Sequence, residues 1–496
     1  MLLREVVAGL EYERIQGDLD FKVSSISYNS TEVTKDGLFV AITGLTVDGH
    51  SFIPNAIEKG ARVIVLEKEV PVPDYVTVLK VKNSRDALAL ISSNFYHHPT
   101  KKLRLIGITG TNGKTSTSYF LKSILEEAQK TTGIIGTIGT IIKDQHIKNK
   151  NTTPESLNLQ QIFSKMVDAE VDHCVMEVSS HSLSLKRVAY CQFDTGIFTN
   201  LTPDHLELHK TMEGYFEAKA LLFEMTSDFN IVNVDDPYGQ RLVERLKDGP
   251  AELITYGIEN PATIYATDIH CEANFTTYTL NTPIGTLPLQ LNVPGEVNVY
   301  NSLAAAACAY SEGIPLETIK RGIEAITNIK GRFEEIYRDE NIRVVVDFAH
   351  TEDGLKKALS TLRPFTKGRL IVVFGVYAPA GKEGREKRLG MGEVAAKYAD
   401  FSVVTSDNPK HLDPHLIVQE ISEALDKHQA DYKVIIDREE AIQYALNISR
   451  KDDVILLAGK GHETSQIIGN EEIPFNEKEI VRSYMAKRRV ALGSAN

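Results

Sequence analysis

The stretch Ile106-Gly-Ile-Thr-Gly-Thr-Asn-Gly-Lys-Thr-Ser-Thr117 joins a short apolar segment to a helical pattern. Residues 103–109 are typical of a buried strand, and the apolar residues of 121–128 recur at the spacing of one helix face. The free N–H groups at such a helix start carry a partial positive charge that attracts phosphate. The stretch therefore predicts a phosphate-binding loop at the edge of an α/β sheet.

The spacing of this loop departs from the standard pattern, which places four residues between two glycines before Lys and Ser/Thr. Counted back from Gly113, the position of the first glycine is occupied by Ile108. A plain glycine turn between a core strand and a core helix is the alternative. Because Gly-Lys-Thr at a helix start is specific, we predict a shorter phosphate loop in which Lys114 contacts the terminal phosphates and Thr115 binds Mg²⁺.

Length and composition describe an ordinary cytoplasmic protein of several domains. The chain has 496 residues, which favours three domains, and its net charge of −12 weighs against nucleic acid or an anionic membrane as a partner. The opening MLLREVVAGL resembles neither a signal peptide nor a membrane span. The cysteines are scattered, which indicates reduced cytosol: Cys174, Cys191, Cys271 and Cys308.

The pattern of expected strands and helices divides the chain into three parts. Residues 1–100 contain short strands and helices, 101–331 open with the phosphate loop, and 332–496 alternate strand and helix. That alternation predicts a parallel, doubly wound, Rossmann-like sheet. The fold class is α/β with three domains, of which the central one is a P-loop ATPase-like parallel sheet.

A second group of residues suggests a metal site. Glu177 and His205 follow two strand-like segments, so they are expected near the loop, where a carboxylate could bind Mg²⁺ together with Thr115. His205 is less typical, since Mg²⁺ prefers oxygen. Lys219 lies among apolar residues; its spacing alone favours a solvated surface lysine, and the alternative is a buried lysine of lowered pKa that takes up CO₂ as a carbamate.

Ten motifs, in this order, span nearly the whole chain: GITGTNGKT, NTTPE, MEVSSHSL, FTNLTPDHLELH, AKALLF, VNVYNSLAAA, GRFE, VVDFAHTEDGL, SDNP and AGKGHE. Together they resemble the Mur ligase family, and within it the UDP-N-acetylmuramoyl-tripeptide synthetases. The resemblance implies an ATP-dependent ligase that joins a diamino acid to UDP-N-acetylmuramoyl-L-alanyl-D-glutamate through an acyl phosphate, during cytoplasmic synthesis of peptidoglycan precursor. Both substrates are small molecules, and the protein is expected to be a monomer.

The resemblance also implies roles for individual residues. Lys114, Lys219 and His205 would be catalytic, and Lys219 would be carbamylated from CO₂. The metal ligands would be Thr115, Glu177, His205 and Lys219. The ATP-binding residues would be Gly110, Thr111, Asn112, Gly113, Lys114, Thr115, Ser116, Asn301, Arg332, Asp347 and His350. The UDP-sugar contacts would be Ser30, Thr152, Thr153, Ser179 and Arg187.

The amino-acid site is where the chain departs from the family pattern. The residues implied there are Asp407, Asn408, Pro409, Lys410, Gly459, Glu463 and Arg385. Lys410 stands where enzymes specific for meso-diaminopimelate carry an arginine that grips a distal carboxylate, and a lysine offers only a point charge. A second family arginine falls in 375–388, where Lys382 or Arg385 could replace it. We expect meso-diaminopimelate to be preferred over L-lysine.

Two further departures from the family pattern concern the sugar site. This chain has Asn29-Ser30-Thr31 where the family often has Asp-Ser-Arg, and Leu185 where the family has a polar residue. Two other functions remain open from the sequence. One is a paralogous Mur-like ligase with another amine or acyl substrate, such as a folylpolyglutamate synthase; SDNP and GKGHE favour the tripeptide synthetases instead. The other is a non-catalytic regulator that binds a nucleotide sugar, which the presence of Lys114, Glu177 and Lys219 argues against.

Overall fold

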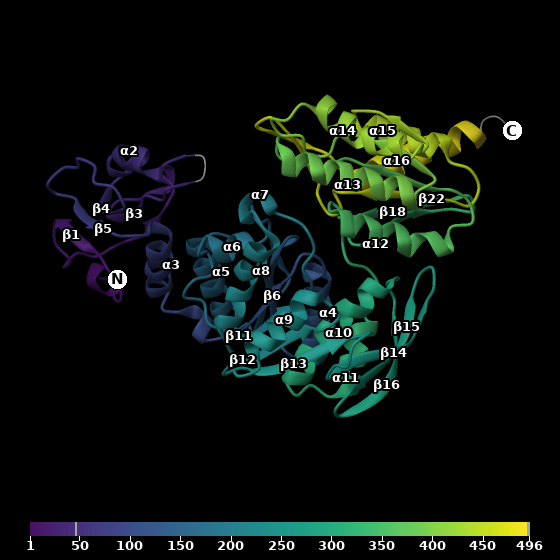
Figure 1. The fold of residues 1–496 in the computed structure, drawn as a ribbon. Coiled ribbons are helices and arrows are strands. Elements are labelled where there is room, and N and C mark those ends of the chain that lie inside the picture. Colours follow the sequence, from purple (N-terminus) through teal and green to yellow (C-terminus); the bar gives the residue numbers. More distant parts are fainter. Residues whose placement is uncertain (45–46, 494–496) are drawn as a thin grey trace.

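The computed structural model describes residues 1–44 and 47–493, and it places them in three α/β bodies, with the middle one between the other two (Figure 1). The N-terminal body has a five-stranded sheet in the order β1-β5-β4-β3-β2, parallel except for β1. Its central strands are apolar on both faces, as buried parallel strands require. The elements are α1 (Leu3–Val6), β1 (Glu13–Gln16), β2 (Ile26–Ser27), β3 (Gly37–Val40), α2 (Ile53–Glu58), β4 (Ala61–Leu66), β5 (Thr77–Lys80) and α3 (Ser84–Phe95).

The middle body has an eleven-stranded sheet in the order β16-β15-β14-β13-β12-β11-β6-β10-β7-β8-β9. Its strands are β6 (Arg104–Thr109), β7 (Thr132–Gly136), β8 (Gly139–Ile142), β9 (Gln145–Ile147), β10 (His173–Glu177), β11 (Phe193–Phe198), β12 (Thr226–Asn233), β13 (Glu252–Gly257), β14 (Ile264–Cys271), β15 (Thr276–Thr282) and β16 (Gly285–Leu291). The strands from β14 to β7 run parallel, and antiparallel strands extend both edges.

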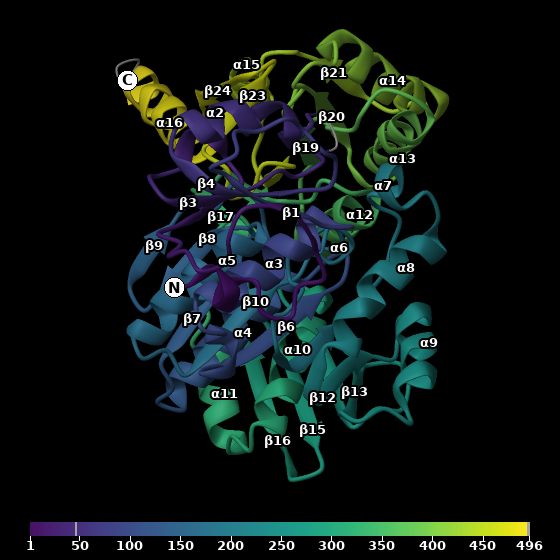
Figure 2. The same cartoon turned by 90° about the vertical axis from the view of Figure 1, so that its left-hand side faces the viewer.

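Helices cover both faces of this middle sheet. One apolar core joins it to α4, α10 and α11, and a second core joins it to α5, α8 and α9. Figure 2 shows α9 on the side of the strands away from α11. The helices are α4 (Lys114–Glu127), α5 (Ser156–Asp168), α6 (Ser180–Ser184), α7 (Leu206–His209), α8 (Met212–Ala220), α9 (Pro237–Leu246), α10 (Glu296–Ser311) and α11 (Leu316–Glu324).

The C-terminal body has a six-stranded sheet in the order β17-β18-β22-β19-β20-β21, parallel except for β17. Its elements are β17 (Glu334–Arg338), β18 (Ile342–Asp347), α12 (Glu352–Leu362), β19 (Leu370–Phe374), α13 (Lys382–Tyr398), β20 (Phe401–Val404), α14 (Pro414–Lys427), β21 (Tyr432–Val434), α15 (Arg438–Ile448), β22 (Asp453–Ala458) and α16 (Glu477–Gly493), with the hairpin β23 (Ser465–Ile468) and β24 (Glu471–Pro474). Strand order and direction confirm the predicted doubly wound sheet.

The predicted fold class is confirmed, with one refinement in the middle body. The parallel centre was expected from the phosphate loop, whereas the antiparallel strands β8, β9, β15 and β16 at its edges were not. Among the residues that the structure describes, no helix combines the length and apolar character needed to span a membrane.

Candidate active site

The phosphate loop lies between β6 and α4, and two of its glycines are required by close packing. Gly110 has φ +146°, and a Cβ there would lie 1.8 Å from Thr199 Oγ1. Gly113 has φ +91°, and its Cβ would lie 2.4 Å from Asn301 Oδ1. No side chain larger than hydrogen fits at either position, so the shorter loop keeps glycine where backbone must approach backbone or ligand.

Lys114 begins α4 and turns its ammonium back over the loop. Its Nζ donates to the carbonyl oxygens of Gly110 and Thr111, both at 2.9 Å. Burial lowers the pKa of Lys114, partly offset by Glu177. A lysine held by two loop carbonyls is placed to contact an anion bound in the loop.

Glu177 ends β10 against the start of α4. The Thr115 hydroxyl donates to Glu177 Oε1 at 2.9 Å, and the Thr137 hydroxyl donates to Glu177 Oε2 at 2.8 Å. Arg332 crosses from the C-terminal body and donates to Thr115 Oγ1 at 2.9 Å. A buried hydroxyl and carboxylate side by side are oxygen ligands of the kind that Mg²⁺ takes beside a nucleotide.

Lys219, near the end of α8, is buried, with 1% of its surface exposed. Its Nζ donates to the Gly110 carbonyl at 2.8 Å and lies 4.7 Å from the centre of the Tyr215 ring. The pKa of Lys219 is held well below its usual range, mainly by burial and to a smaller extent by the charge of Lys114. The surface position that spacing alone favoured is therefore wrong, because Lys219 lies on the buried face of α8, with its ammonium against the phosphate loop.

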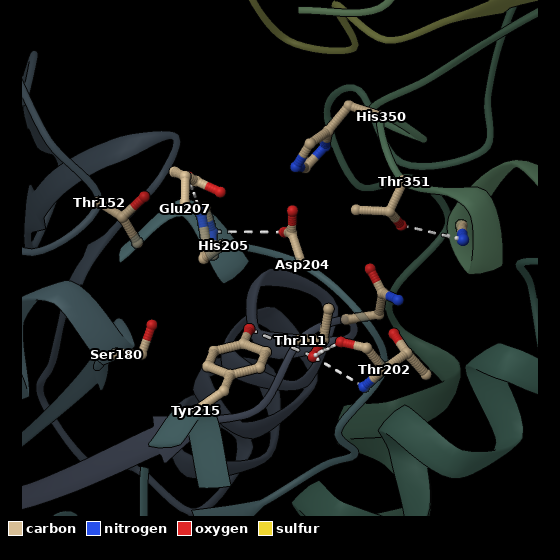
Figure 3. Close-up of polar contacts among 12 residues, drawn as sticks. Thr111, Thr152, Ser180, Thr202, Asp204, His205, Glu207, Tyr215, His350 and Thr351 are labelled. Atoms are coloured by element: carbon tan, nitrogen blue, oxygen red, sulfur yellow. Dashed lines mark hydrogen bonds and ion pairs between the residues drawn. The ribbon is translucent and has the colours of Figure 1, made fainter. Parts of the chain in front are cut away.

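His205 lies just before α7, close to several ionisable groups (Figure 3). Its Nε2 is 3.3 Å from Asp204 Oδ2, and its Nδ1 is 3.5 Å from Glu207 Oε1. Ligand atoms of His181, His205 and Glu207 lie within 4.8 Å of one another. Burial and the neighbouring His205 lower the pKa of His181 to about 4.

Asp204 connects the middle and C-terminal bodies. Lys387 of α13 reaches across to it, with Nζ 3.1 Å from Asp204 Oδ1. Burial raises the pKa of Asp204, but Lys387, His205 and His350 outweigh it and hold the pKa below its usual range. Figure 3 shows His350 approaching Asp204 from the side of the C-terminal body.

A cavity of ≈ 280 Å³, here called the loop cavity, opens above the phosphate loop. Most of the predicted nucleotide residues line it: Thr111, Asn112, Gly113, Lys114, Thr115, Ser116, Asn301, Arg332, Asp347 and His350. Gly110 does not line it, but its carbonyl holds Lys114 and Lys219. The guanidinium of Arg332 stacks 4.5 Å from the centre of the Phe348 ring, and burial raises the pKa of Asp347.

Four of the five predicted sugar contacts lie together beside this cavity. Thr152 and Ser179 line it. The Thr153 hydroxyl donates to the Glu177 carbonyl at 2.9 Å, and Arg187 donates to the Thr153 carbonyl at 3.1 Å. Ser30 belongs to the N-terminal body and is not among the lining residues, so the structure does not bring it to the other four.

A second cavity of ≈ 290 Å³, here called the C-terminal cavity, lies at the carboxyl ends of β19, β20 and β22. Asp407, Asn408, Lys410, Gly459 and Glu463 line it as predicted. Pro409 does not line it and packs beneath, buried.

Arg385 is a second predicted residue that does not line this cavity. Glu383, Gly384 and Lys387 share one face of α13 and line the cavity, whereas Arg385 lies on another face and pairs with Glu423 of α14. The exposed Lys382, the other candidate for the family arginine, pairs with Glu386 and does not line the cavity either. The helix register, which the sequence alone did not fix, separates these residues.

Lys460 is a site residue that sequence analysis missed. It is fully buried, and its Nζ donates to Asn408 Oδ1 at 3.1 Å and to Glu463 Oε2 at 2.9 Å. It also lies 3.6 Å from Asp407. Lys460 therefore fixes three of the predicted amino-acid residues at once. The sequence feature that could have identified Lys460 as a site residue is its position inside the GKGHE motif.

The two cavities meet. His205, Phe348 and His350 line both of them. A group activated in the loop cavity is thus adjacent to whatever occupies the C-terminal cavity, with Lys387 and Asp204 at the junction.

Known proteins resemble this chain over nearly its whole length. Family profiles match residues 22–96 (Mur ligase family, catalytic domain), 108–309 (Mur ligase middle domain) and 331–461 (Mur ligase, glutamate ligase domain). The UDP-N-acetylmuramoyl-L-alanyl-D-glutamate–2,6-diaminopimelate ligase 1 of Clostridium acetobutylicum is 45% identical over 98% of this chain and 99% of its own. The corresponding ligase of Clostridium perfringens is 43% identical over 97% and 99%.

A solved structure of a UDP-N-acetylmuramoyl-L-alanyl-D-glutamate–2,6-diaminopimelate ligase superposes with a TM-score of 0.68 at 27% identity, and covers 99% of both chains. Sequence and structure therefore agree over the same length. The chain belongs to the Mur ligase family, whose members are ATP-dependent ligases.

Proposed function

We propose that this protein joins 2,6-diaminopimelate to UDP-N-acetylmuramoyl-L-alanyl-D-glutamate at the expense of ATP, in cytoplasmic synthesis of peptidoglycan precursor. The reaction would release ADP and phosphate. The names of relatives that are 43–45% identical over nearly the whole chain support the substrates. The observation that carries the proposal is that the loop cavity and the C-terminal cavity share His205, Phe348 and His350.

The chemistry explains why two adjoining cavities are needed. A carboxylate does not react with an amine at neutral pH, because its leaving group is poor. The D-glutamate carboxylate attacks the γ-phosphorus of ATP, and the resulting acyl phosphate has a good leaving group. The amine then attacks the acyl carbon, and phosphate departs. The protein's task is to position the groups and stabilise developing charge, and an amine held beside the acyl phosphate competes with water.

The loop cavity supports the nucleotide half of this proposal. Lys114 is placed to contact the terminal phosphates, and Asn301, Arg332 and Asp347 to hold adenine and ribose. Thr115 and Glu177 would hold one Mg²⁺; His205 and a carbamylated Lys219 would hold a second. Bound Mg²⁺ would neutralise phosphate charge. The burial and lowered pKa of Lys219 favour the neutral amine that combines with CO₂.

The residues predicted to contact the UDP-sugar substrate would hold the muramoyl dipeptide. Thr152, Thr153, Ser179 and Arg187 lie beside Glu177, where the muramoyl dipeptide would present its carboxylate to the nucleotide. Ser30 would reach the sugar nucleotide from the N-terminal body. We also propose the domain division 1–100, 101–331 and 332–496, which is supported by the position of the main sheets within these ranges.

The proposal is tested by ADP release from purified protein with MgATP. We expect release only when the UDP-muramoyl dipeptide and an amine are both present, with meso-diaminopimelate giving a higher kcat/KM than L-lysine or L-ornithine. The product's mass, measured by mass spectrometry, identifies the amide formed. Equal release with all amines, or none with any of them, would contradict the proposed function.

A further inference from the structure

A buried ion pair lies next to the C-terminal cavity without lining it. Arg438 is the first residue of α15 and Glu477 is the first residue of α16, and their side chains are 0% and 2% exposed. Arg438 Nε donates to Glu477 Oε1 at 2.8 Å. Because apolar residues of similar volume can often replace such a pair without loss of stability, stability alone does not account for it.

Arg438 also contacts the strand that leads to the cavity. Its Nη2 donates to the carbonyl oxygen of Ala458, the last residue of β22, at 2.8 Å. Gly459 follows with φ +110° and lines the cavity, and a Cβ built on it would lie 3.3 Å from Asp407 Oδ2. The guanidinium therefore holds the end of β22 at the point where Gly459 packs against Asp407.

The pair has one donor and one acceptor that are not used by these contacts. Among the side chains that the structure describes, Arg438 Nη1, Glu477 Oε2 and Asp407 Oδ1 are buried and have no hydrogen-bond partner. Buried polar atoms in folded proteins are nearly always satisfied by protein or by ordered water. Arg438 Nη1 is thus a donor available to the Asp407 carboxylate, directly or through ordered water.

Asp407 has no cation of its own. Lys460 donates to Glu463 at 2.9 Å, and Arg438 donates to Glu477 at 2.8 Å, so each of the two cations has a different carboxylate as its hydrogen-bonded partner. Lys460 Nζ lies 3.6 Å from Asp407 Oδ1, beyond hydrogen-bond distance. Burial raises the pKa of Asp407, and the charge of Arg438 opposes that rise more strongly than the charge of Lys460 does. Asp407 therefore depends on Arg438.

We propose that Arg438 and Glu477 are positioning residues for the amine step, and that they act through Asp407. Glu477 anchors the guanidinium from α16, and the guanidinium holds the end of β22 and the Asp407 carboxylate in the arrangement that the C-terminal cavity presents to the amine. Neither residue lines a cavity, so neither is placed to touch a substrate. This inference rests on the proposed function, and it makes the start of α16 part of the support of the amine site.

The test removes both charges together, because Arg438→Gln alone would leave Glu477 buried without a partner and could prevent folding. The double variant Arg438→Gln/Glu477→Gln keeps side chains that can hydrogen-bond to each other. We expect it to raise KM for meso-diaminopimelate about 10- to 100-fold, the range for loss of one interaction with a charged group, with KM for ATP and for the UDP-muramoyl dipeptide within about twofold. Initial rates of ADP release, with one substrate varied at a time, give the three constants.

Rescue by lysine separates the charge from the packing. Arg438→Lys keeps the positive charge but loses the fork that contacts Glu477 and Ala458 at once, and it should bring KM for meso-diaminopimelate to within about fivefold of the unsubstituted value. If the pair served only to hold the helices together, Arg438→Lys would be no better than the neutral double variant. Circular dichroism and the melting temperature show that each variant is folded.

A matched control lies at the opposite, amino edge of the same sheet. Arg369 Nη2 donates to Asp453 Oδ2 and to the carbonyl oxygen of Ile448, both at 2.7 Å, so it too joins a buried carboxylate to a main-chain carbonyl. Neither Arg369 nor Asp453 lines the C-terminal cavity. Arg369→Gln/Asp453→Asn should lower the melting temperature and leave all three KM values unchanged.

The positioning role is overturned if the folded Arg438→Gln/Glu477→Gln protein keeps all three KM values, or raises all three alike. Failure of the proposed function is seen separately, as absence of meso-diaminopimelate-dependent ADP release by the unsubstituted protein. The same comparison of KM values would then be made with the amine that the unsubstituted protein accepts.

Discussion

Replacing Lys114 by alanine is expected to lower the rate of ADP release about 10²- to 10³-fold, equivalent to about 3–4 kcal/mol of lost stabilisation of transferring charge. The reason is geometric. Two loop carbonyls hold the ammonium beside the loop cavity, where the terminal phosphates would bind, and alanine would remove that positive charge. The measurement is single-turnover ADP release at saturating MgATP, with circular dichroism to confirm that the fold persists.

Lys122→Ala is the matched control for that substitution. Lys122 lies two turns further along α4, pairs with Glu126 at the helix surface and does not line the loop cavity. Its removal should change the rate less than about twofold, since Lys122 lies away from the loop cavity and a partly exposed ion pair contributes little. A Lys114→Ala protein that keeps near-normal turnover would show that the loop does not contact the transferring phosphate.

Replacing Lys219 by methionine is expected to abolish most ligase activity, by at least about 10²-fold, while nucleotide binding persists. Methionine preserves length in a buried position but cannot form a carbamate. The proposed ATP contacts come from the loop and the C-terminal body, so the affinity for nucleotide, measured by calorimetry, should be nearly unchanged. Equal loss of nucleotide affinity and activity would indicate collapse of the loop rather than loss of a carbamate.

Carbon dioxide provides the second readout at Lys219. Protein stripped of CO₂ should lose activity and regain it when bicarbonate is added. Since only the neutral amine combines with CO₂, and burial lowers the pKa of Lys219, carbamate should form at a lower pH than on an exposed lysine and be lost on acidification. ¹³C NMR with labelled bicarbonate detects the adduct without acid quenching. The Lys219→Met protein should show no such signal.

Sequence patterns predicted the fold well where they report local chemistry. The loop at Gly110–Lys114 and the C-terminal strands follow from short motifs, because a motif and its backbone geometry are set by neighbouring residues. Asn301, Arg332 and Asp347 were implied by the family resemblance, and their role in binding nucleotide stays a prediction. Lys219 was different. Its apolar neighbours suit either an exposed or a buried position on the helix, and only the packing of α8 beside the phosphate loop decides between them.

The amino-acid site was harder for a similar reason. Arg385 and Lys387 differ by two positions, and the register of α13 decides which one faces the cavity. Arg438 and Glu477 are 39 positions apart in the chain, so no local pattern could pair them. Their contact depends on two helices, α15 and α16, that begin beside the same edge of the sheet.

The contacts that cross from the phosphate loop to α12 and α13 have a thermodynamic consequence. Asn112 of the loop donates to Asp353 at 2.8 Å, and Lys387 pairs with Asp204. The proposed nucleotide and amine sites thus lie in bodies whose relative placement depends on the same contacts. A ligand that favours one placement changes the affinity for the other ligand. Reciprocity then requires equal effects in both directions: any factor by which nucleotide strengthens amine binding is the factor by which the amine strengthens nucleotide binding.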